Sequence, residues 1–420
     1  MSFNKSKSVS LKRAFSFSAI ESIGSRIFDL VALWLVLNNL SSEDVAKFGL
    51  ATSSIFIFNL IFFAPETSLY KYFKEWNENK IINRYMTSFY YFSFFKLSIH
   101  IILIGCIYIF FGMNWCFYAL IFSFITQNVQ FSEITKIFMR MSLRQELVAR
   151  YEILSKLTLV FFLTSLLFYS SINVYFTIYF FWSFLSSVFW FKCGRDFNLE
   201  VEHDICKVKE DIIFSSLGFS LWTHISGTLT YLIYNSGVFA LEFFKYNIED
   251  IAVYVTVNKI ANLFFVIPMF FQSFVPVALS SSTGDESKFK KLLTVCTIIS
   301  FIQLLFFAIL GEYIGKFFGI KGDDIERFYY YSIIIQIGTF LLNATRPLST
   351  YLMIKYNPTK MMKKVFIPSS MLAVFLYFLM TKHYGVYGLC FSILCVYAYM
   401  SLSLLVIFLS VKNECKDSHK

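Results

Sequence analysis

The side chains of this chain that could do chemistry are charged and imidazole groups set inside long apolar stretches. They are Arg26, Asp29, Lys96, His100, His224, Lys259 and Arg346. A charge inside a membrane-spanning helix is costly and usually faces a helix-bundle interior or a water-filled cavity, so each of these is a candidate site residue. Their net charge is positive, and Arg and Lys bind phosphate or carboxylate oxygens. The set therefore predicts a cavity that receives an anion.

The spacing of these residues suggests how some of them are paired. Arg26 and Asp29 are three residues apart, so one helical face can hold them as an ion pair, which is either structural or substrate-binding. Lys96 and His100 share a face of a later helix. Arg346 precedes Pro347, which removes a backbone donor and predicts a kink over 343–347 beside the guanidinium.

Bland alternatives exist for the remaining candidates. His100 and His224 fit hydrogen-bonded packing residues as well as site residues. Lys259 is close enough to one predicted interface for its ammonium to reach water along an apolar stem. The charges predicted near helix ends, where water is close, are not expected to be site residues: Glu66, Glu133, Glu152 and Lys156, the last two spaced for a helical pair.

The motifs of the sequence give little support to an enzymatic function. No GxxxxGK[ST] phosphate loop is present, and the 8 cysteines form no CxxC pair or Cys/His cluster, so no catalytic residues, cofactor or metal ligands are predicted. Adjacent Asp323 and Asp324 could hold a divalent metal for a membrane glycosyltransferase or polymerase, but such an enzyme would need a larger outer loop. The chain is predicted not to be an enzyme.

The elements that must position these residues are membrane-spanning helices. Hydrophobic residues make up 57% of the chain and charged residues 15%, where soluble domains carry about 25% charged. A helix needs about 20 apolar residues to cross a bilayer. Spans are predicted at 14–37, 45–69, 87–112, 115–137, 148–170, 172–191, 212–236, 250–280, 292–316, 328–353, 365–381 and 385–411. The predicted fold class is all-α, a polytopic membrane protein of about 12 transmembrane helices.

The basic residues predict the orientation of these spans. Most of the 37 Lys and Arg residues fall in one set of alternate segments, and positively charged loops are retained in the cytoplasm. Both termini are therefore predicted to be cytoplasmic. The net charge of +10 is spread over these segments and forms no single patch with stacking aromatics, so nucleic acid is not a predicted partner.

An internal repeat accompanies this topology. Residues 42–48 (SEDVAKF) recur as 248–254 (IEDIAVY), and each copy opens an even-numbered span. The offset implies two parallel six-helix bundles, 1–205 and 206–420, which is one transporter architecture. If the repeat is real, residues 42–69 will superpose on 248–275.

The residues around the first copy resemble those of a known family. The basic N-terminus, the first span with Arg26 and Asp29, and the passage Leu40 to Leu50 (LSSEDVAKFGL) resemble Wzx-type polysaccharide flippases, which belong to the multidrug/oligosaccharidyl-lipid/polysaccharide exporter superfamily. The family pattern is L-x-x-E-D-x-G-x-F/Y-G/A, and its usual glycine is Ala46 here and Ala252 in the second copy. The resemblance covers nearly the whole chain.

The resemblance implies a function and its partners. It implies that two six-helix bundles enclose a central cavity and flip an undecaprenyl-diphosphate-linked oligosaccharide, an O-antigen (lipopolysaccharide) or capsule repeat unit, from the cytoplasmic to the periplasmic leaflet of a bacterial inner membrane. It also implies a coupling ion (H⁺ or Na⁺), and polysaccharide polymerase and chain-length proteins as partners. The main alternative is an ion-coupled drug or metabolite exporter of the same fold, which would need buried carboxylates, whereas Asp29 is the one acidic residue predicted at mid-depth.

Overall fold

The described part of the chain is built from helices. This computed structural model describes residues 11–63, 66, 68–79, 81–112, 114–196, 210–263, 286–355 and 358–417. We call the helices up to residue 196 the N-half and those from residue 210 the C-half. The N-half contains α1 (Leu11–Asn39), α2 (Ser42–Ile61), α3 (Ser68–Glu78), α4 (Ile82–Phe111), α5 (Trp115–Met141), α6 (Gln145–Leu163), the 3-10 turn η2 (Thr164–Leu167) and α7 (Ile172–Asp196).

The C-half continues the same pattern of long rods and tight connections. It contains α8 (Glu210–Asn235), α9 (Gly237–Phe243), α10 (Ile248–Leu263), α12 (Glu286–Phe317), α13 (Asp324–Lys355), α14 (Pro358–Met361), the π-turn η4 (Met362–Phe366) and α15 (Ile367–Asp417). Gly385, with φ 61°, breaks α15 into two runs that fold back on each other. Glycine suits this position because a side chain at positive φ is strained.

The predicted all-α, polytopic class is confirmed, and each of the twelve predicted spans overlaps a described helix or a run of α15 in whole or in part. Five described stretches are long and apolar enough to cross a membrane on their own composition. They are Ser42–Ile61, Ile82–Phe111, Ile172–Gly194, Leu293–Phe317 and Thr359–Ser410. Helices α1 and α13 are as long as these stretches but less uniformly apolar, because they carry candidate charges. Such charges are placed on the side of a helix that faces the bundle interior and not lipid.

Three predicted segments differ from the structure or extend beyond it. The span predicted at 45–69 ends at Ile61, ahead of Pro65 in the sequence, and a short helix, α3, follows it. The predicted outer loop after residue 236 contains the short helix α9. The span predicted at 250–280 coincides with α10 as far as Leu263, and its remainder lies outside the described residues.

Both copies of the internal repeat begin a helix. Ser41 accepts a hydrogen bond from the Asp44 amide and caps α2, and Glu43 and Asp44 in its first turn are matched by Glu249 and Asp250 in α10. Acidic residues at this position stabilise the positive end of the helix dipole. The superposition of 42–69 on 248–275 and the boundary at 205/206 remain predictions, since both include residues outside the described ones.

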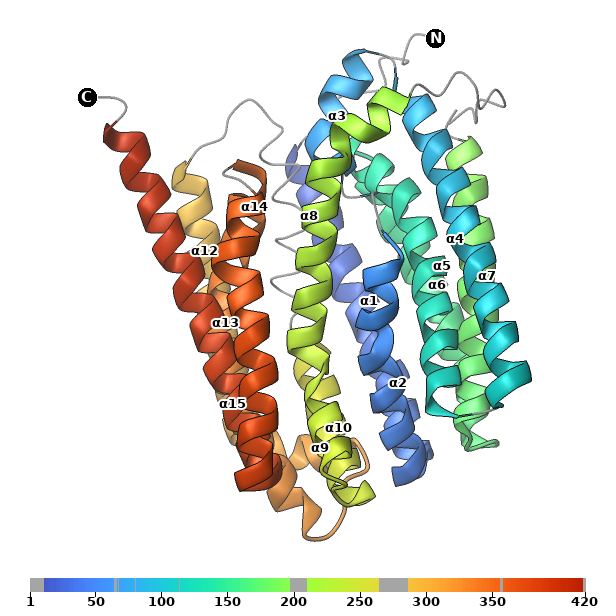
Figure 1. Cartoon of the computed structure of the whole chain (residues 1–420), viewed down its shortest axis with the longest axis vertical. Helices are drawn as coiled ribbons and strands as arrows, with labels where there is room; N and C mark the ends of the chain where they lie inside the picture. The colour runs from blue at the N-terminus through green and yellow to red at the C-terminus, as the bar shows by residue number, and fades with distance from the viewer. Residues whose placement is uncertain are drawn as a thin grey trace.

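The helices pack as two flanking groups joined by a central set (Figure 1). In the N-half α1 packs on α6, and α5 packs on α2, α4 and α7; in the C-half α13 packs on α12 and α15. The halves meet mainly through α2 with α10 and α2 with α8. The start of α1 and the end of α15 lie at one end of the bundle, and α9 with the start of α10 lies at the other (Figure 1).

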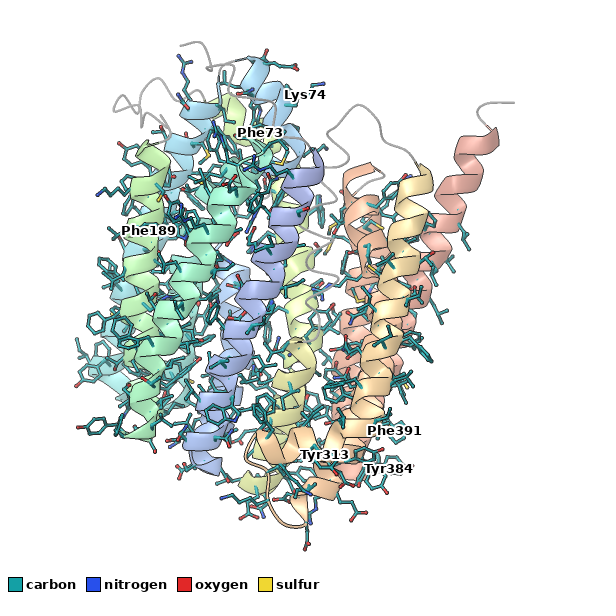
Figure 2. The ribbon with its side chains drawn as sticks, turned by 180° about the vertical axis from the view of Figure 1, so that it is seen from behind. Phe73, Lys74, Phe189, Tyr313, Tyr384 and Phe391 are labelled. Carbon is teal, nitrogen blue, oxygen red and sulfur yellow. The ribbon has the colours of Figure 1, made fainter. Side chains whose placement is uncertain are left out.

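The outer face of the bundle is apolar. Figure 2 shows Phe189 and Phe391 pointing away from the helices, and Tyr313 and Tyr384 gather at the end of the bundle where α12 ends. All four are exposed, as expected for side chains that face lipid or its interface. Lys74 points away from α3, while Leu69 and Trp76 on the other side of that helix are buried. The chain is a multi-pass membrane protein.

Candidate functional site: a cavity between the halves

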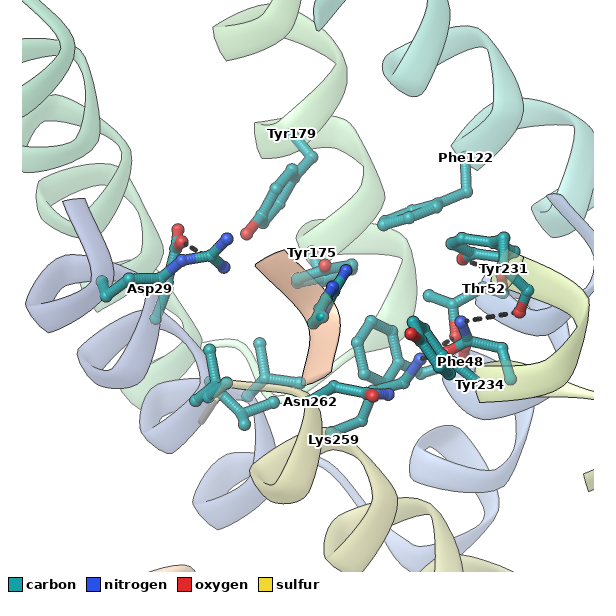
Figure 3. A pocket seen from close by; sticks show the side chains of 17 residues that line it. Asp29, Phe48, Thr52, Phe122, Tyr175, Tyr179, Tyr231, Tyr234, Lys259 and Asn262 are labelled. Atoms are coloured by element: carbon teal, nitrogen blue, oxygen red, sulfur yellow. Dashed lines mark hydrogen bonds and ion pairs between the residues drawn. The ribbon is translucent and has the colours of Figure 1, made fainter. Parts of the chain in front are cut away.

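A cavity of about 390 Å³ lies between the N-half and the C-half. Helices α1, α2, α5 and α7 form one side of it, and α8, α10 and α13 form the other. Figure 3 shows its lining side chains converging from these helices. The lining consists of Arg26, Asp29, Ala32, Leu33, Val36, Phe48, Thr52, Phe122, Tyr175, Tyr179, Tyr231, Tyr234, Asn235, Lys259, Asn262, Leu263 and Arg346.

Four of the predicted site residues therefore share one cavity. Three are cations, Arg26, Lys259 and Arg346, and one is a carboxylate, Asp29. Asp29 and Lys259 lie on different sides of the cavity in Figure 3. A volume of this size is within the range of about 300–1,000 Å³ that small-molecule sites occupy. A cavity with this lining can hold an anionic group of moderate size.

The predicted pair of Arg26 and Asp29 forms across one turn of α1, with Nη1 3.3 Å from Oδ2. The third member of this group, Lys156, was not predicted as a site residue. Lys156 of α6, which was placed near water at a helix end, donates to Oδ1 of Asp29 at 2.8 Å. Asp29 thus balances two cations, and α1 is held against α6 at the wall of the cavity. The predicted helical pair of Lys156 with Glu152 is replaced by this contact, and Glu152 pairs with Lys136 instead.

Lys259 is at the seam between the halves. Its ammonium donates to the Thr52 hydroxyl at 2.6 Å, lies 3.4 Å from the amide oxygen of Asn235 and lies over the Phe48 ring. Thr52 and Phe48 belong to α2, so the side chain reaches across from α10 to the N-half. It does not extend toward the outer interface. The hydroxyl, amide and ring are neutral groups, so these contacts leave the positive charge of Lys259 uncompensated.

Arg346 reaches the cavity from α13, and its guanidinium lies over the Tyr234 ring at 5.4 Å from the ring centre. Helix α13 continues through Pro347 to Lys355, so the helix does not end at the predicted kink over 343–347. The hydroxyls of Thr345 and Ser349 donate to carbonyls of the preceding turn, which helps to satisfy backbone groups near the proline. The proline therefore alters the hydrogen bonding next to Arg346 and leaves the helix intact.

Aromatic side chains form much of the remaining wall. Tyr175 and Tyr179 of α7, Tyr231 and Tyr234 of α8, and Phe48 and Phe122 line the cavity. The Tyr231 hydroxyl donates to the Thr52 carbonyl at 2.5 Å, which is a second contact from the C-half to α2. Tyrosine offers an apolar face with a polar tip, so this wall suits a ligand with flat hydrophobic faces and hydroxyl groups.

Lys96, His100 and His224 are not among the lining residues of this cavity. Lys96, which is expected to share a cavity with Arg26 and Arg346, lies outside the lining of this cavity among the described residues. The depth of a residue along a helix does not specify the side of the bundle that it faces. These three side chains lie instead around the last turn of α2 and the residues just after it.

The contacts of this second group centre on backbone carbonyls. Lys96 donates to the Phe63 carbonyl at 2.9 Å, and His224 donates through Nε2 to the Asn59 carbonyl at 2.6 Å. His100 donates through Nδ1 to the Lys96 carbonyl at 3.4 Å, and its Nε2 lies 3.0 Å from the Ser123 hydroxyl. Helix C-termini leave carbonyls without intrahelical donors and carry partial negative charge, so cationic or N–H groups stabilise them.

The N-half also contains a buried ion network that was not predicted from the sequence. Arg140 of α5 pairs with Glu21 of α1 and with Glu133, while Lys136 pairs with Glu133 and with Glu152 of α6. The i, i+3 and i+7 spacing of Glu133, Lys136 and Arg140 was a usable signal, because it aligns three charges along one helical face. This network joins three helices and gives the N-half a rigid frame. Within the described residues no group of His, Cys, Asp and Glu has the arrangement of a metal site.

No protein-family model and no curated protein sequence matches this chain. Solved structures do. An outward-facing multidrug resistance transporter of the MATE family, in the MOP superfamily, has a TM-score of 0.69 at 13% identity over 97% of each chain. The eukaryotic MATE transporter AtDTX14 has a TM-score of 0.66 at 11% identity over 95% of each chain. The lipid II flippase MurJ, in an inward closed conformation, has a TM-score of 0.63 at 17% identity, covering 94% of this chain and 87% of that chain.

At these identities the likeness shows the fold. The chain is a helical membrane protein with the fold of MOP-superfamily transporters, the superfamily to which the Wzx-type flippases also belong. The resemblance found in the sequence is supported at this level. The narrower Wzx assignment concerns the substrate and is a proposal.

Proposed function

We propose that this chain is a flippase for an undecaprenyl-diphosphate-linked oligosaccharide, an O-antigen or capsule repeat unit. It moves the head group from the cytoplasmic to the periplasmic leaflet of the bacterial inner membrane, with both of its own termini in the cytoplasm. Residues 1–205 and 206–420 act as two units that alternate in access, and the protein performs no covalent chemistry. The observation that carries the proposal is the cavity between the halves, in which three cations face one carboxylate.

The charge balance favours an anionic substrate. Asp29 is already engaged by Arg26 and Lys156, so the cavity has no carboxylate to spare among the residues described. The ammonium of Lys259 donates to a hydroxyl and lies near an amide oxygen, both of which are neutral groups. Burying such cations is costly unless counter-charge or water meets them. A diphosphate supplies that counter-charge, since a guanidinium binds its oxygens in two places and an ammonium acts as a point charge.

The rest of the lining suits the remainder of such a head group. Sugar rings present flat C–H faces edged by hydroxyls, which match the faces and hydroxyl tips of Tyr175, Tyr179 and Tyr231. Asn235 and Asn262 add amide donors and acceptors. The polyprenyl chain stays in lipid along the apolar outer face, so the cavity has to accept only the polar head.

A drug or metabolite exporter of the same fold is the second candidate, since MATE transporters share the fold. Asp29 is the feature that favours it, because a carboxylate in the cavity could bind a cationic compound. The two cations on Asp29 weigh against that role. The glycosyltransferase alternative weakens further, because Asp324 pairs with Arg327, which also pairs with Asp250.

Lipid movement in proteoliposomes tests the proposal. The probe is a fluorescent short-chain polyprenyl-diphosphate disaccharide, and its exposure is read by chemical quenching of the outer leaflet. Replacing Arg26, Lys259 or Arg346 by Ala should slow movement by about ten- to hundredfold, the loss of one hydrogen-bonded charge contact. Arg346→Lys should retain part of the rate.

Two cations outside the cavity provide the matched control. Lys47, paired with Glu43 on the surface of α2, and Lys316 at the end of α12 should tolerate Ala with an unchanged rate. If a folded triple Ala variant of Arg26, Lys259 and Arg346 moves the lipid probe at the full rate, the flippase proposal is wrong. Export of a cationic dye that depends on Asp29 would support the exporter instead.

A further inference from the structure

The end of α2 forms a joint that receives hydrogen-bond donors from both halves. Lys96 of α4 donates to the Phe63 carbonyl from within the N-half. His224 of α8 donates to the Asn59 carbonyl from the C-half. The Phe63 ring packs edge-on against the His224 ring. One imidazole therefore bridges the two halves at a helix end where carbonyls carry partial negative charge.

From this geometry we infer that His224 is the proton-binding site that couples the movement of the halves to pH. A ligand shifts an equilibrium between two conformations only if it binds them with different affinity. A group buried inside one half sees the same neighbours in both conformations. His224 does not, because relative movement of the halves changes its distance from the Asn59 carbonyl and from Lys96. This inference rests on the proposed function, in that it assumes that the halves move.

Histidine is suited to this task because its unperturbed pKa lies where the charge changes between about pH 5 and pH 8. Two ionisable groups of the N-half lie at the same joint, Lys96 and the buried Glu66, which interacts electrostatically with Lys96. Other helices packed on α8 also carry ionisable groups. Among the side chains that the structure describes, these are Tyr70, Lys71, Tyr72, Lys74, Glu75 and Glu78 on α3, Glu43, Asp44 and Lys47 on α2, Glu242 on α9, Lys360 on α14, Lys363 and Lys364 on η4, and Tyr377, Lys382, His383, Tyr384, Tyr387, Cys390, Cys395, Tyr397 and Tyr399 on α15.

His100 is a natural control. It is fully buried and makes three contacts, but its partners, Ser123, the Lys96 carbonyl and the Phe62 ring, all belong to the N-half. Its surroundings therefore move with it. If burial of a histidine were sufficient for pH sensitivity, His100 and His224 would behave alike. If contact with both halves is required for pH sensitivity, only His224 would confer it.

The test measures the conformation directly in the full-length chain. Spin labels are placed at Ser170 and Asp323, two exposed positions in the connections α6–α7 and α12–α13, in a background without native cysteines. Distances are recorded in proteoliposomes from about pH 5 to pH 8. The ratio of the two distance populations should change by up to about tenfold per pH unit, the limit for one proton.

His224→Gln keeps an amide N–H for the Asn59 carbonyl but cannot titrate, so it should hold the ratio constant across this range. His224→Asn carries the same expectation, and His100→Gln should titrate like the parent. Any of three results would overturn the inference. The first is a ratio in the parent protein that does not change with pH. The other two are a pH-dependent ratio in both His224 variants and a pH-independent ratio in His100→Gln as well. The lipid assay tests the proposed function separately. If the lipid probe does not move but the distances still depend on pH through His224, the proposed substrate is wrong and the inference about the proton site holds.

Discussion

Asp29 both joins two helices of the N-half and lines the cavity. It lines the cavity, yet its two oxygens are bound by Arg26 of its own helix and by Lys156 of α6. Each of the three side chains is partly exposed, so solvent screening limits what the contacts add to stability. Removing Asp29 alone would still leave two cations facing each other. The structural and substrate-binding alternatives for Arg26 are therefore not exclusive.

A double-mutant cycle separates these roles. Asp29→Asn and Lys156→Met should each lower thermal stability in detergent, and the double variant should lose less than the sum, with a coupling of about 0.5–3 kcal/mol. Lipid movement should fall in Asp29→Asn because Arg26 loses its orientation. Additive stability losses would show that the contact between α1 and α6 is not maintained by this pair.

At the scale of elements, the contact of α2 with α10 sets how closely the halves approach. A Cβ built on Gly49 would lie 2.2 Å from Cγ2 of Val255, so only glycine permits this approach. The two repeat copies thus meet face to face. Lys259, one turn beyond Val255 on α10, then reaches Thr52 of α2. Helix α8 adds Tyr231 and His224 as further contacts from the C-half.

A larger side chain at residue 49 should overpack this contact, and a smaller one at residue 255 should relieve the overpacking. Gly49→Ala should destabilise the conformation seen here by about 1–3 kcal/mol, because two side chains would compete for one space. Val255→Ala in the same chain should restore much of the loss. Gly227→Ala is the control, since a Cβ there meets nothing within 4 Å. Thermal unfolding in detergent compares the three variants with the parent, and a Gly49→Ala chain as stable as the parent would contradict the close approach.

At the scale of the whole molecule, the flippase proposal requires that the halves separate at the end where α2 and α10 begin. Contacts other than the one at Gly49 also close this end. Trp34 and Asn38 at the end of α1 both donate to the Phe317 carbonyl at the end of α12. These hydrogen bonds join the halves without a charge pair, so they can break and re-form at modest cost.

A cross-link should therefore stop transport. In a cysteine-free background, Gly49→Cys with Val255→Cys places the side chains on Cβ positions 3.2 Å apart, close to the separation of about 3.5–4.5 Å found in disulfides. Oxidation should abolish movement of the lipid probe, and reduction should restore it. Each single cysteine variant is the control. Unchanged movement in the fully cross-linked protein would show that this end need not open.

Orientation is a second property of the whole molecule, and accessible tags test it. Residues 70–85, 193–210 and 281–291 should react from the cytoplasm and 240–249 from outside, because basic loops are retained in the cytoplasm. Finding 193–210 outside would be incompatible with the predicted topology.

The sequence by itself determined the solvent and the helices, and it placed the charged residues along them. Lipid forces every spanning segment to satisfy its own backbone, so span positions follow from local composition alone. The tertiary structure decided which charges meet. Arg26, Asp29, Lys259 and Arg346 converge because three helices from the two halves, α1, α10 and α13, present them to one cavity, while Lys96 and His224 turn to the end of α2. That choice depends on the rotation and packing of whole helices, which spacing within one helix does not specify.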